Sequence, residues 1–194
     1  RRIARDNLAA ALPELAAAER VRIVDACFRH FGAAFCDALS ARRFDAPELC
    51  RRVTWEGFEH LLEAERAGRG VIVLAAHFGN WEVSTIAGLA HYPDFRGRFH
   101  FVRRAIKPAW LDALVTRRFN QAGFGVIGKR GSLDRILDLL AAGDVIVFPF
   151  DQHANPPDGI EVDFFGHPAW TFKSLAIIAL ATGAPVLPAT SWRE

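Results

Sequence analysis

The sequence predicts an α/β fold, in which a mostly parallel sheet has helices on both faces and an amino-terminal helical segment precedes it. Two observations support this prediction. Apolar runs without polar alternation, such as residues 70–76, are typical of strands that are covered on both faces. From residue 69 onward such runs alternate with longer helical patterns, as expected of a parallel sheet. The chain has 194 residues, 51% of them hydrophobic, and can therefore bury one sizeable core.

Residues 1–68 form the predicted amino-terminal helical segment. Within Glu19–Leu39 apolar side chains recur every three or four residues, which predicts an amphipathic helix whose apolar face is Val21, Val24, Phe28, Phe31 and Phe35. Residues 56–68 predict a shorter helix that Gly68 ends. Residues 69–194 form the predicted α/β core. Its expected strands are Gly70–Ala76, Arg98–Arg103, Gly125–Ile127, Asp144–Phe150 and Pro185–Ala189. Its expected helices are Glu82–His91, Pro108–Ala122, Ser132–Ala142 and Thr171–Thr182.

Composition excludes several classes of protein. The formal net charge of +2 is too small to predict a nucleic-acid partner. The three cysteines lack C-x-x-C spacing, so neither a disulfide framework nor a structural zinc site is expected. No apolar run reaches the roughly 18 residues that mark a membrane-spanning helix. Because the chain lacks methionine and stops directly after its last predicted strand, we expect it to be a piece of a longer product, truncated at its carboxyl end.

A histidine and a glutamate follow the first predicted strand, in the stretch VIVLAAHFGNWEVS (residues 71–84). Residues five apart point about 140° away from each other on one helix, so His77 and Glu82 are not a helical zinc-binding pair. With His77 at a strand end and Glu82 in the first turn of the next helix, a turn at Gly79 can bring the side chains together. A histidine held by a carboxylate is a general-base arrangement. The alternative is a strand-end histidine that bonds a backbone group.

Five blocks of the sequence carry a family resemblance. HFGNWE resembles the HX4(D/E) motif of the bacterial lipid A late acyltransferases, within the larger group of lysophospholipid and glycerolipid acyltransferases. Residues 101–127 resemble the arginine-bearing block of that family, residues 143–152 its strand that ends in an acid, and residues 162–188 its Phe-Phe-Gly block. Residues 5–15 are similar to the segment that follows the family's amino-terminal membrane anchor.

The resemblance implies an acyltransferase acting at the cytoplasmic face of the bacterial inner membrane. It implies that a fatty acyl chain moves from an acyl-carrier-protein or coenzyme A thioester to a hydroxyl of a membrane glycolipid of the lipid A precursor type. No cofactor other than this donor is expected. By the same resemblance His77 is the base and Glu82 its partner, Arg103 or the adjacent Arg104 belongs to the arginine block, and Asp151 is the acid that ends the third block.

Six residues are predicted to bind substrate, and they are Asn80, Arg103, Arg104, Asp151, Phe164 and Phe165. The two arginines end a strand that we expect to neighbour the His77 strand, where they could neutralise a phosphate or an oxyanion. The two phenylalanines stand beside a glycine in an expected loop, and there they could line a slot for the acyl chain.

Other interpretations remain open at this stage. The acceptor could be a phosphatidylinositol mannoside, an ornithine lipid or an aryl polyene. A metal-dependent hydrolase could use His77, Glu82, Asp151 and His153, although their spacing matches no metal-ligand pattern and no metal is expected. A non-catalytic lipid-binding protein is a third possibility. The stretch GFGVIGKR (residues 123–130) matches nucleotide-binding patterns, but we interpret it as a turn because the strand falls inside it.

Overall fold

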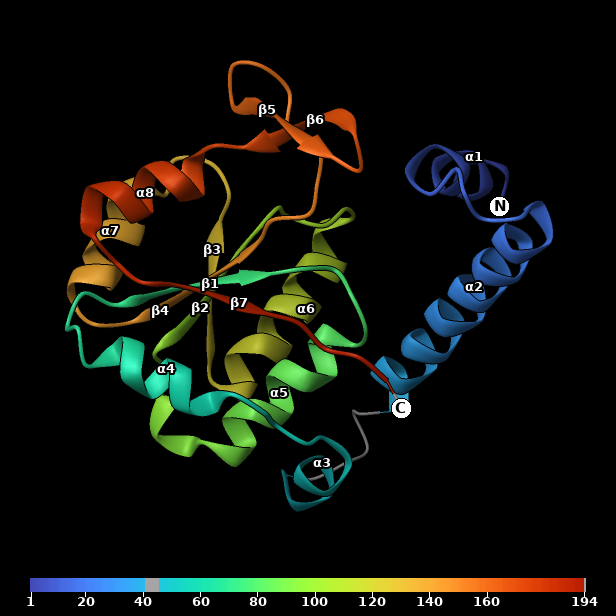
Figure 1. Cartoon of the computed structure of the whole chain (residues 1–194). Coiled ribbons are helices and arrows are strands. Elements are labelled where there is room, and N and C mark those ends of the chain that lie inside the picture. The colour runs from blue at the N-terminus through green and yellow to red at the C-terminus, as the bar shows by residue number, and fades with distance from the viewer. Residues whose placement is uncertain (41–45, 194) are drawn as a thin grey trace.

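The computed structural model describes residues 1–40 and 46–193, apart from the side chains of Ala38, Leu39, Ala46 and Glu82. Within this part of the chain a parallel five-stranded sheet has the order β3-β2-β4-β1-β7 (Figure 1). Its strands are β1 (Val71–Ala75), β2 (Phe99–Arg103), β3 (Phe124–Gly128), β4 (Val145–Pro149) and β7 (Val186–Ala189). Each lies within a residue of its predicted bounds, and the α/β fold is confirmed.

Helices cover both faces of the sheet, as predicted (Figure 1). One face is covered by α4 (Phe58–Glu65), α5 (Trp81–His91), which leads into the short 3-10 helix η2 (Pro93–Phe95), and α6 (Ala109–Ala122). The other face is covered by α7 (Leu133–Ala141) and α8 (Ser174–Thr182). Val71 and Val73 of β1 join the first core and Ile72 joins the second. A strand buried on both faces has to be apolar at consecutive positions, which explains the runs in the sequence.

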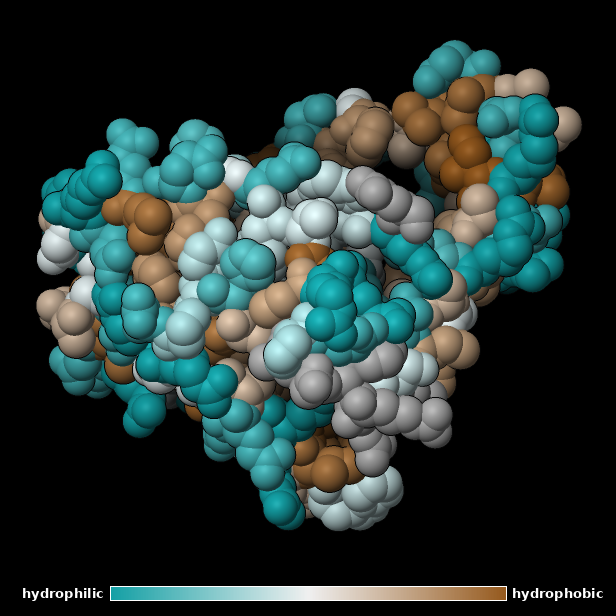
Figure 2. All heavy atoms as spheres, turned by 90° about the horizontal axis from the view of Figure 1, so that it is seen from below, coloured by the Kyte–Doolittle hydropathy of each residue, from teal (hydrophilic) through white to brown (hydrophobic). Residues whose placement is uncertain are grey.

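Three further helices precede the sheet, namely α1 (Arg2–Ala11), α2 (Ala17–Ser40) and α3 (Ala46–Arg52). The helices α1 and α2 form a hairpin that stands to one side of the sheet (Figure 1), and apolar side chains gather over it (Figure 2). The predicted apolar face of α2 is largely uncovered, because Val24 is buried whereas Phe31 and Phe35 are 58% and 66% exposed. None of the described helices is both long and apolar enough to cross a bilayer. The boundary at residue 68 stays a prediction.

A β-hairpin replaces the loop that was expected around Phe164 and Phe165. The strands β5 (Gly159–Phe164) and β6 (His167–Phe172) pair antiparallel in a sheet of their own, and α8 therefore begins three residues after the predicted Thr171. The sequence carries the signal for β5, since Ile160, Val162 and Phe164 alternate with polar residues. The expectation that the Arg103 strand neighbours the His77 strand was also wrong, because β4 lies between β2 and β1.

Candidate active site

The register of two central strands brings His77 and Asp151 together. Strands β1 and β4 are parallel neighbours, and their pairing sets Ala75 opposite Pro149. The backbone N–H of Phe150 donates to the carbonyl of Ala75 at 3.0 Å, which extends the pairing by one step. His77 and Asp151 stand two positions after these paired residues, at the carboxyl end of the sheet. Ligands of open α/β sheets bind at that end, so the pair is a candidate active site.

The carboxylate of Asp151 holds His77 by two hydrogen bonds. Nδ1 of His77 lies 2.7 Å from Oδ1 of Asp151, and the backbone N–H of His77 donates to Oδ2 at 2.7 Å. Because an ionised carboxylate only accepts, Nδ1 is the nitrogen that carries the proton, and Nε2 of the neutral ring keeps the lone pair. A histidine with this tautomer can accept a proton at Nε2.

The charge of Asp151 is stabilised by the same contacts. Desolvation acts to raise the pKa of Asp151, but hydrogen bonds from the side chain and backbone of His77 outweigh it and hold this pKa below its usual value of 3.8. Asp151 is therefore ionised near neutral pH and can stabilise an imidazolium that forms beside it. Both side chains remain accessible, with 39% and 40% of their surfaces exposed, so a substrate hydroxyl can reach the ring.

Both residues were predicted to belong to the site, but the expected partner of His77 was Glu82. The signal for the observed partner lies in two matching strands, because β1 and β4 both begin Val-Ile-Val. His77 and Asp151 each follow at the same number of positions after that start, and the register pairs Val71 with Val145. Glu82 lies in the first turn of α5, but its side chain is outside the part of the structure that is described. Its role stays a prediction.

The loop between His77 and α5 is fixed on two sides. Ser191 Oγ donates to the carbonyl of Phe78 at 2.9 Å, and a Cβ added at Gly79 would lie 2.0 Å from the Ser191 carbonyl oxygen. Asn80 caps α5 by accepting from the Val83 backbone N–H at 3.4 Å, and it donates to the Ala34 carbonyl of α2 at 3.1 Å. Asn80 was predicted to bind substrate. Here both ends of its amide bond the protein, and its role in substrate binding stays a prediction.

Arg103 connects the end of β2 to α6, and β4 lies between β2 and the His77 strand. Its Nη1 donates to Asp112 Oδ1 at 2.6 Å and its Nη2 to Thr116 Oγ1 at 2.6 Å. The backbone N–H of Ile106, followed by the Arg103 guanidinium, lowers the pKa of Asp112. Only 15% of the Arg103 side chain is exposed. The described contacts of Arg103 are therefore structural, whereas the neighbouring Arg104 is exposed.

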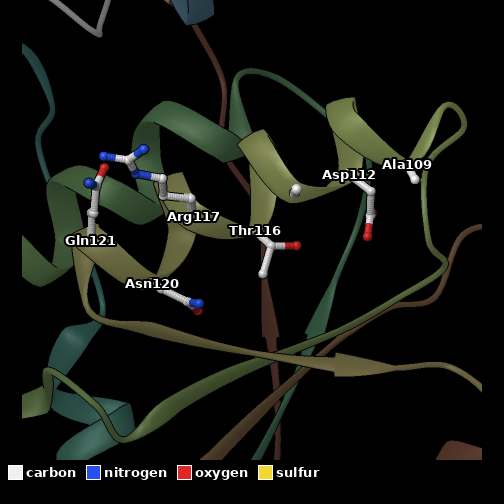
Figure 3. A pocket seen from close by; sticks show the side chains of 7 residues that line it. Ala109, Asp112, Thr116, Arg117, Asn120 and Gln121 are labelled. Carbon is white, nitrogen blue, oxygen red and sulfur yellow. The ribbon is translucent and has the colours of Figure 1, made fainter.

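A groove of about 630 Å³ runs along α6 (Figure 3). Asp112, Thr116 and Asn120 project from one side of the helix toward it (Figure 3). The groove is lined by α6 alone, and neither His77 nor Asp151 reaches it. Because two of its polar groups already bond Arg103, we do not assign it to the substrate.

Phe164 and Phe165 form the tip of the β5–β6 hairpin. Their rings pack edge to face, with centroids 4.7 Å apart, and they are 63% and 54% exposed. His167, at the start of β6, lies with its Nε2 3.1 Å from the Ala10 carbonyl oxygen of α1. The hairpin tip is therefore next to the amino-terminal helices. No described contact joins these phenylalanines to His77, and their role in binding an acyl chain stays a prediction.

Of the residues considered for a hydrolytic metal site, His77 and Asp151 are in contact, whereas His153 has other described partners. His153 Nε2 lies 3.0 Å from Asn155 Oδ1, and the residue pairs with Thr171 through a β-bridge. Among the side chains that the structure describes, no three histidines, cysteines or acids are grouped as metal ligands.

Comparison with known proteins relates the whole chain to one family. A family described as "Bacterial lipid A biosynthesis acyltransferase" matches residues 1–194. The chain is 29% identical over 142 residues to the phosphatidylinositol mannoside acyltransferase of Mycobacterium tuberculosis (strain CDC 1551 / Oshkosh), covering 71% of this chain and 43% of that protein. It is 26% identical over 194 residues to the lipid A biosynthesis palmitoleoyltransferase of Escherichia coli (strain K12), covering 99% of this chain and 61% of that protein. The chain thus spans about half the length of these relatives.

Proposed function

The chain belongs to the bacterial lipid A biosynthesis acyltransferase family, and on that premise we propose that it catalyses transfer of a fatty acyl chain to a hydroxyl group of a glycolipid. The donor in this proposal is an acyl-carrier-protein or acyl-coenzyme A thioester. The observation that supports it most directly is the His77–Asp151 pair at the carboxyl end of the sheet. That pair supplies the base that an acceptor alcohol needs.

In the proposed reaction Nε2 of His77 accepts the proton of the acceptor hydroxyl as its oxygen attacks the thioester carbonyl. The carbon–oxygen bond forms, the carbon–sulfur bond breaks, and the proton passes from the imidazolium to the leaving thiolate. Asp151 keeps the proton on Nδ1 and stabilises the imidazolium. A thioester is already activated, so a covalent enzyme intermediate is unnecessary, and the sequence contains no G-x-S-x-G motif for a serine nucleophile. Glu82 remains in the proposal as a second acid near the base.

The acceptor is proposed at the level of a membrane glycolipid. The relatives named above act on a phosphatidylinositol mannoside and in lipid A biosynthesis, so their acceptors differ while the acyl transfer is shared. Exposed phenylalanines on α2 and on the hairpin tip suit contact with acyl chains, in particular Phe31, Phe35, Phe164 and Phe165. These residues support contact with a membrane surface, and we propose that this surface is the cytoplasmic face of the inner membrane.

The test uses the full-length protein with an acyl thioester and a lipid acceptor, and it measures acylated lipid and free fatty acid by mass spectrometry. The variant His77→Ala is expected to lower the transfer rate by about 10²–10⁴-fold, because the general base is lost. His60→Ala is the matched control, since His60 is exposed on α4 and away from the sheet edge. Normal turnover by a folded His77→Ala variant would refute the proposed base.

The same assay separates transfer from hydrolysis. A hydrolase commonly activates water with a bound ion that lowers the pKa of that water to about 7. The acyltransferase proposal predicts that a chelator leaves the rate unchanged and that free fatty acid is the minor product. Loss of turnover that added zinc restores, or free acid as the main product with acceptor in excess, would replace the proposal with a metal-dependent hydrolase.

A further inference from the structure

Three cations gather at the carboxyl ends of β2 and β3. The register sets Arg103 opposite Gly128, and the backbone N–H of Lys129 donates to the Arg103 carbonyl at 3.0 Å. This pairing places Arg104, which follows β2, beside Lys129 and Arg130, which follow β3. All three side chains are exposed. We call Arg104, Lys129 and Arg130 the cationic cluster.

The acids of the described chain do not neutralise this cluster. Arg103 is already paired with Asp112, but no ion pair among the described residues involves a member of the cluster. Desolvation is the largest cause that lowers the pKa of Lys129, and the positive charges of Arg104 and Arg130 lower it further. The carboxylate of Asp158 acts to raise it. The cations are therefore close enough to repel one another, and their excess positive charge is available to an anion.

A neighbouring aromatic ring holds Lys129 of the cluster. The Nζ of Lys129 lies 3.5 Å from the centroid of the Phe172 ring at the end of β6, which is a cation–π contact. That contact restricts the lysine side chain before any ligand arrives. Binding an anion beside this lysine therefore costs less side-chain conformational entropy than binding beside a freely rotating lysine.

The loop that carries Lys129 and Arg130 leads directly into a helix. Residues 129–132 connect β3 to α7, which is nine residues long, and Ser132 at its N-cap makes no side-chain capping bond. The first backbone N–H groups of a helix lack intrahelical partners, and the helix dipole adds partial positive charge there. The first turn of α7 contains one acid, Asp134, with Arg135 beside it. A strand, a basic loop and a helix N-terminus together form an arrangement that suits phosphate.

We propose that Arg104, Lys129 and Arg130, with the N-terminus of α7, bind a phosphate group of the substrate that does not itself react. The inference rests on the proposed function, since both a phosphopantetheine-bearing donor and a phosphorylated glycolipid acceptor carry such a group. Neighbouring strands are about 4.8 Å apart, so β2 and β3 lie roughly 10 and 14 Å from β1 along the sheet. The phosphate thus binds at the same end of the sheet as His77 but away from the reacting atoms, where binding energy orients the substrate.

Binding measured without turnover tests the site. The full-length protein is titrated with coenzyme A, and separately with phosphatidylcholine vesicles that contain or lack phosphatidylinositol. The variant Lys129→Gln/Arg130→Gln is expected to weaken binding by about tenfold for each cation removed, because each loses a charge-assisted hydrogen bond. Weaker binding of coenzyme A identifies the donor phosphate, and weaker binding of the phosphatidylinositol vesicles identifies the acceptor phosphate.

Two controls complete the experiment. Arg66→Gln/Arg69→Gln removes two exposed cations near the amino end of β1 and is expected to leave both affinities unchanged. Lys129→Arg/Arg130→Lys keeps the charge and is expected to retain most of the binding. Unchanged affinity of the Lys129→Gln/Arg130→Gln variant for both probes, or equal weakening by the control pair, would overturn the site. If binding depends on the cluster but the parent protein transfers no acyl chain, the phosphate site stands and the proposed function fails.

Discussion

Replacing Asp151 by asparagine is expected to move the ring proton of His77 from Nδ1 to Nε2 without changing the shape of the site. Oδ2 of Asp151 accepts from the backbone N–H of His77, a group that can only donate. The new amide therefore has to place its oxygen at that backbone N–H, and its NH2 group then faces Nδ1 at the position where Oδ1 now lies, 2.7 Å away. Nδ1 becomes an acceptor, and the proton of the ring moves to Nε2. The nitrogen that should remove the substrate proton is then already protonated.

The size of the effect follows from this geometry. Where a carboxylate-to-amide change imposes the wrong histidine tautomer, the rate falls by about 10⁴-fold. Because the pair is about 40% exposed and water can partly replace the amide, we expect Asp151→Asn to lower kcat/KM by about 10²–10⁴-fold. Asp151→Ala removes the same negative charge but leaves both tautomers accessible. It should therefore be less damaging than Asp151→Asn.

The assay measures acylated lipid formed by the full-length enzyme at several thioester concentrations. Asp138→Asn, on the exposed surface of α7, controls for loss of a carboxylate elsewhere. Circular dichroism and the melting temperature establish that each variant is folded. The tautomer argument is wrong if Asp151→Asn keeps the parental rate, or if Asp151→Ala is consistently the slower of the two.

Three further changes have definite expected outcomes. Glu82→Gln should slow acyl transfer less than Asp151→Asn in the same assay, because Nδ1 of His77 already bonds Asp151. An equal or larger effect would indicate that Glu82 is the main partner of His77. Gly125→Ala places a Cβ 2.1 Å from Nδ1 of the buried His100 and should lower the free energy of unfolding by about 1–3 kcal/mol. Gly128→Ala is the control, because its Cβ meets open space and should leave that free energy unchanged; urea denaturation measures both variants. The lowered pKa of Asp151 means that its hydrogen bonds stabilise the fold above pH 3.8 and lose this effect as the pH falls through the lower folded-state value. Unfolding free energies of the parent and Asp151→Asn should accordingly converge below that pH, and a constant difference would contradict the assignment.

The sheet strands were predictable because burial on both faces leaves a plain signal. Val71–Ala75 and Val145–Pro149 are apolar at every position, and so short an apolar run rich in β-branched residues is typical of a strand buried on both faces. Strand order has no comparable local signal, since it depends on which crossovers the helices make. Arg103 was for that reason assigned to the wrong neighbouring strand, although its end of the sheet was right.

The sequence named His77 and Asp151 as site residues but did not predict the contact between them. The sequence separation of five between His77 and Glu82 suggested a local pair, whereas the observed contact joins residues 74 positions apart. The matching Val-Ile-Val starts of β1 and β4 indicate that contact only once the two strands are known to pair in register, and this pairing depends on the assembled sheet. The hairpin β5–β6 was missed for a different reason, because its aromatic tip was interpreted as a loop beside a glycine rather than as a turn between alternating strands.

The contact between His77 and Asp151 also has a consequence for folding kinetics. It depends on a central strand pair whose partners are 74 positions apart in the sequence, whereas the helices between those strands can form from local interactions. Contacts of such high sequence separation are costly in loop entropy and form slowly. During refolding, helical circular dichroism should therefore recover first. The return of acyl transfer should follow the docking of β1 against β4, so that enzymatic activity reports when this long-range pairing has formed.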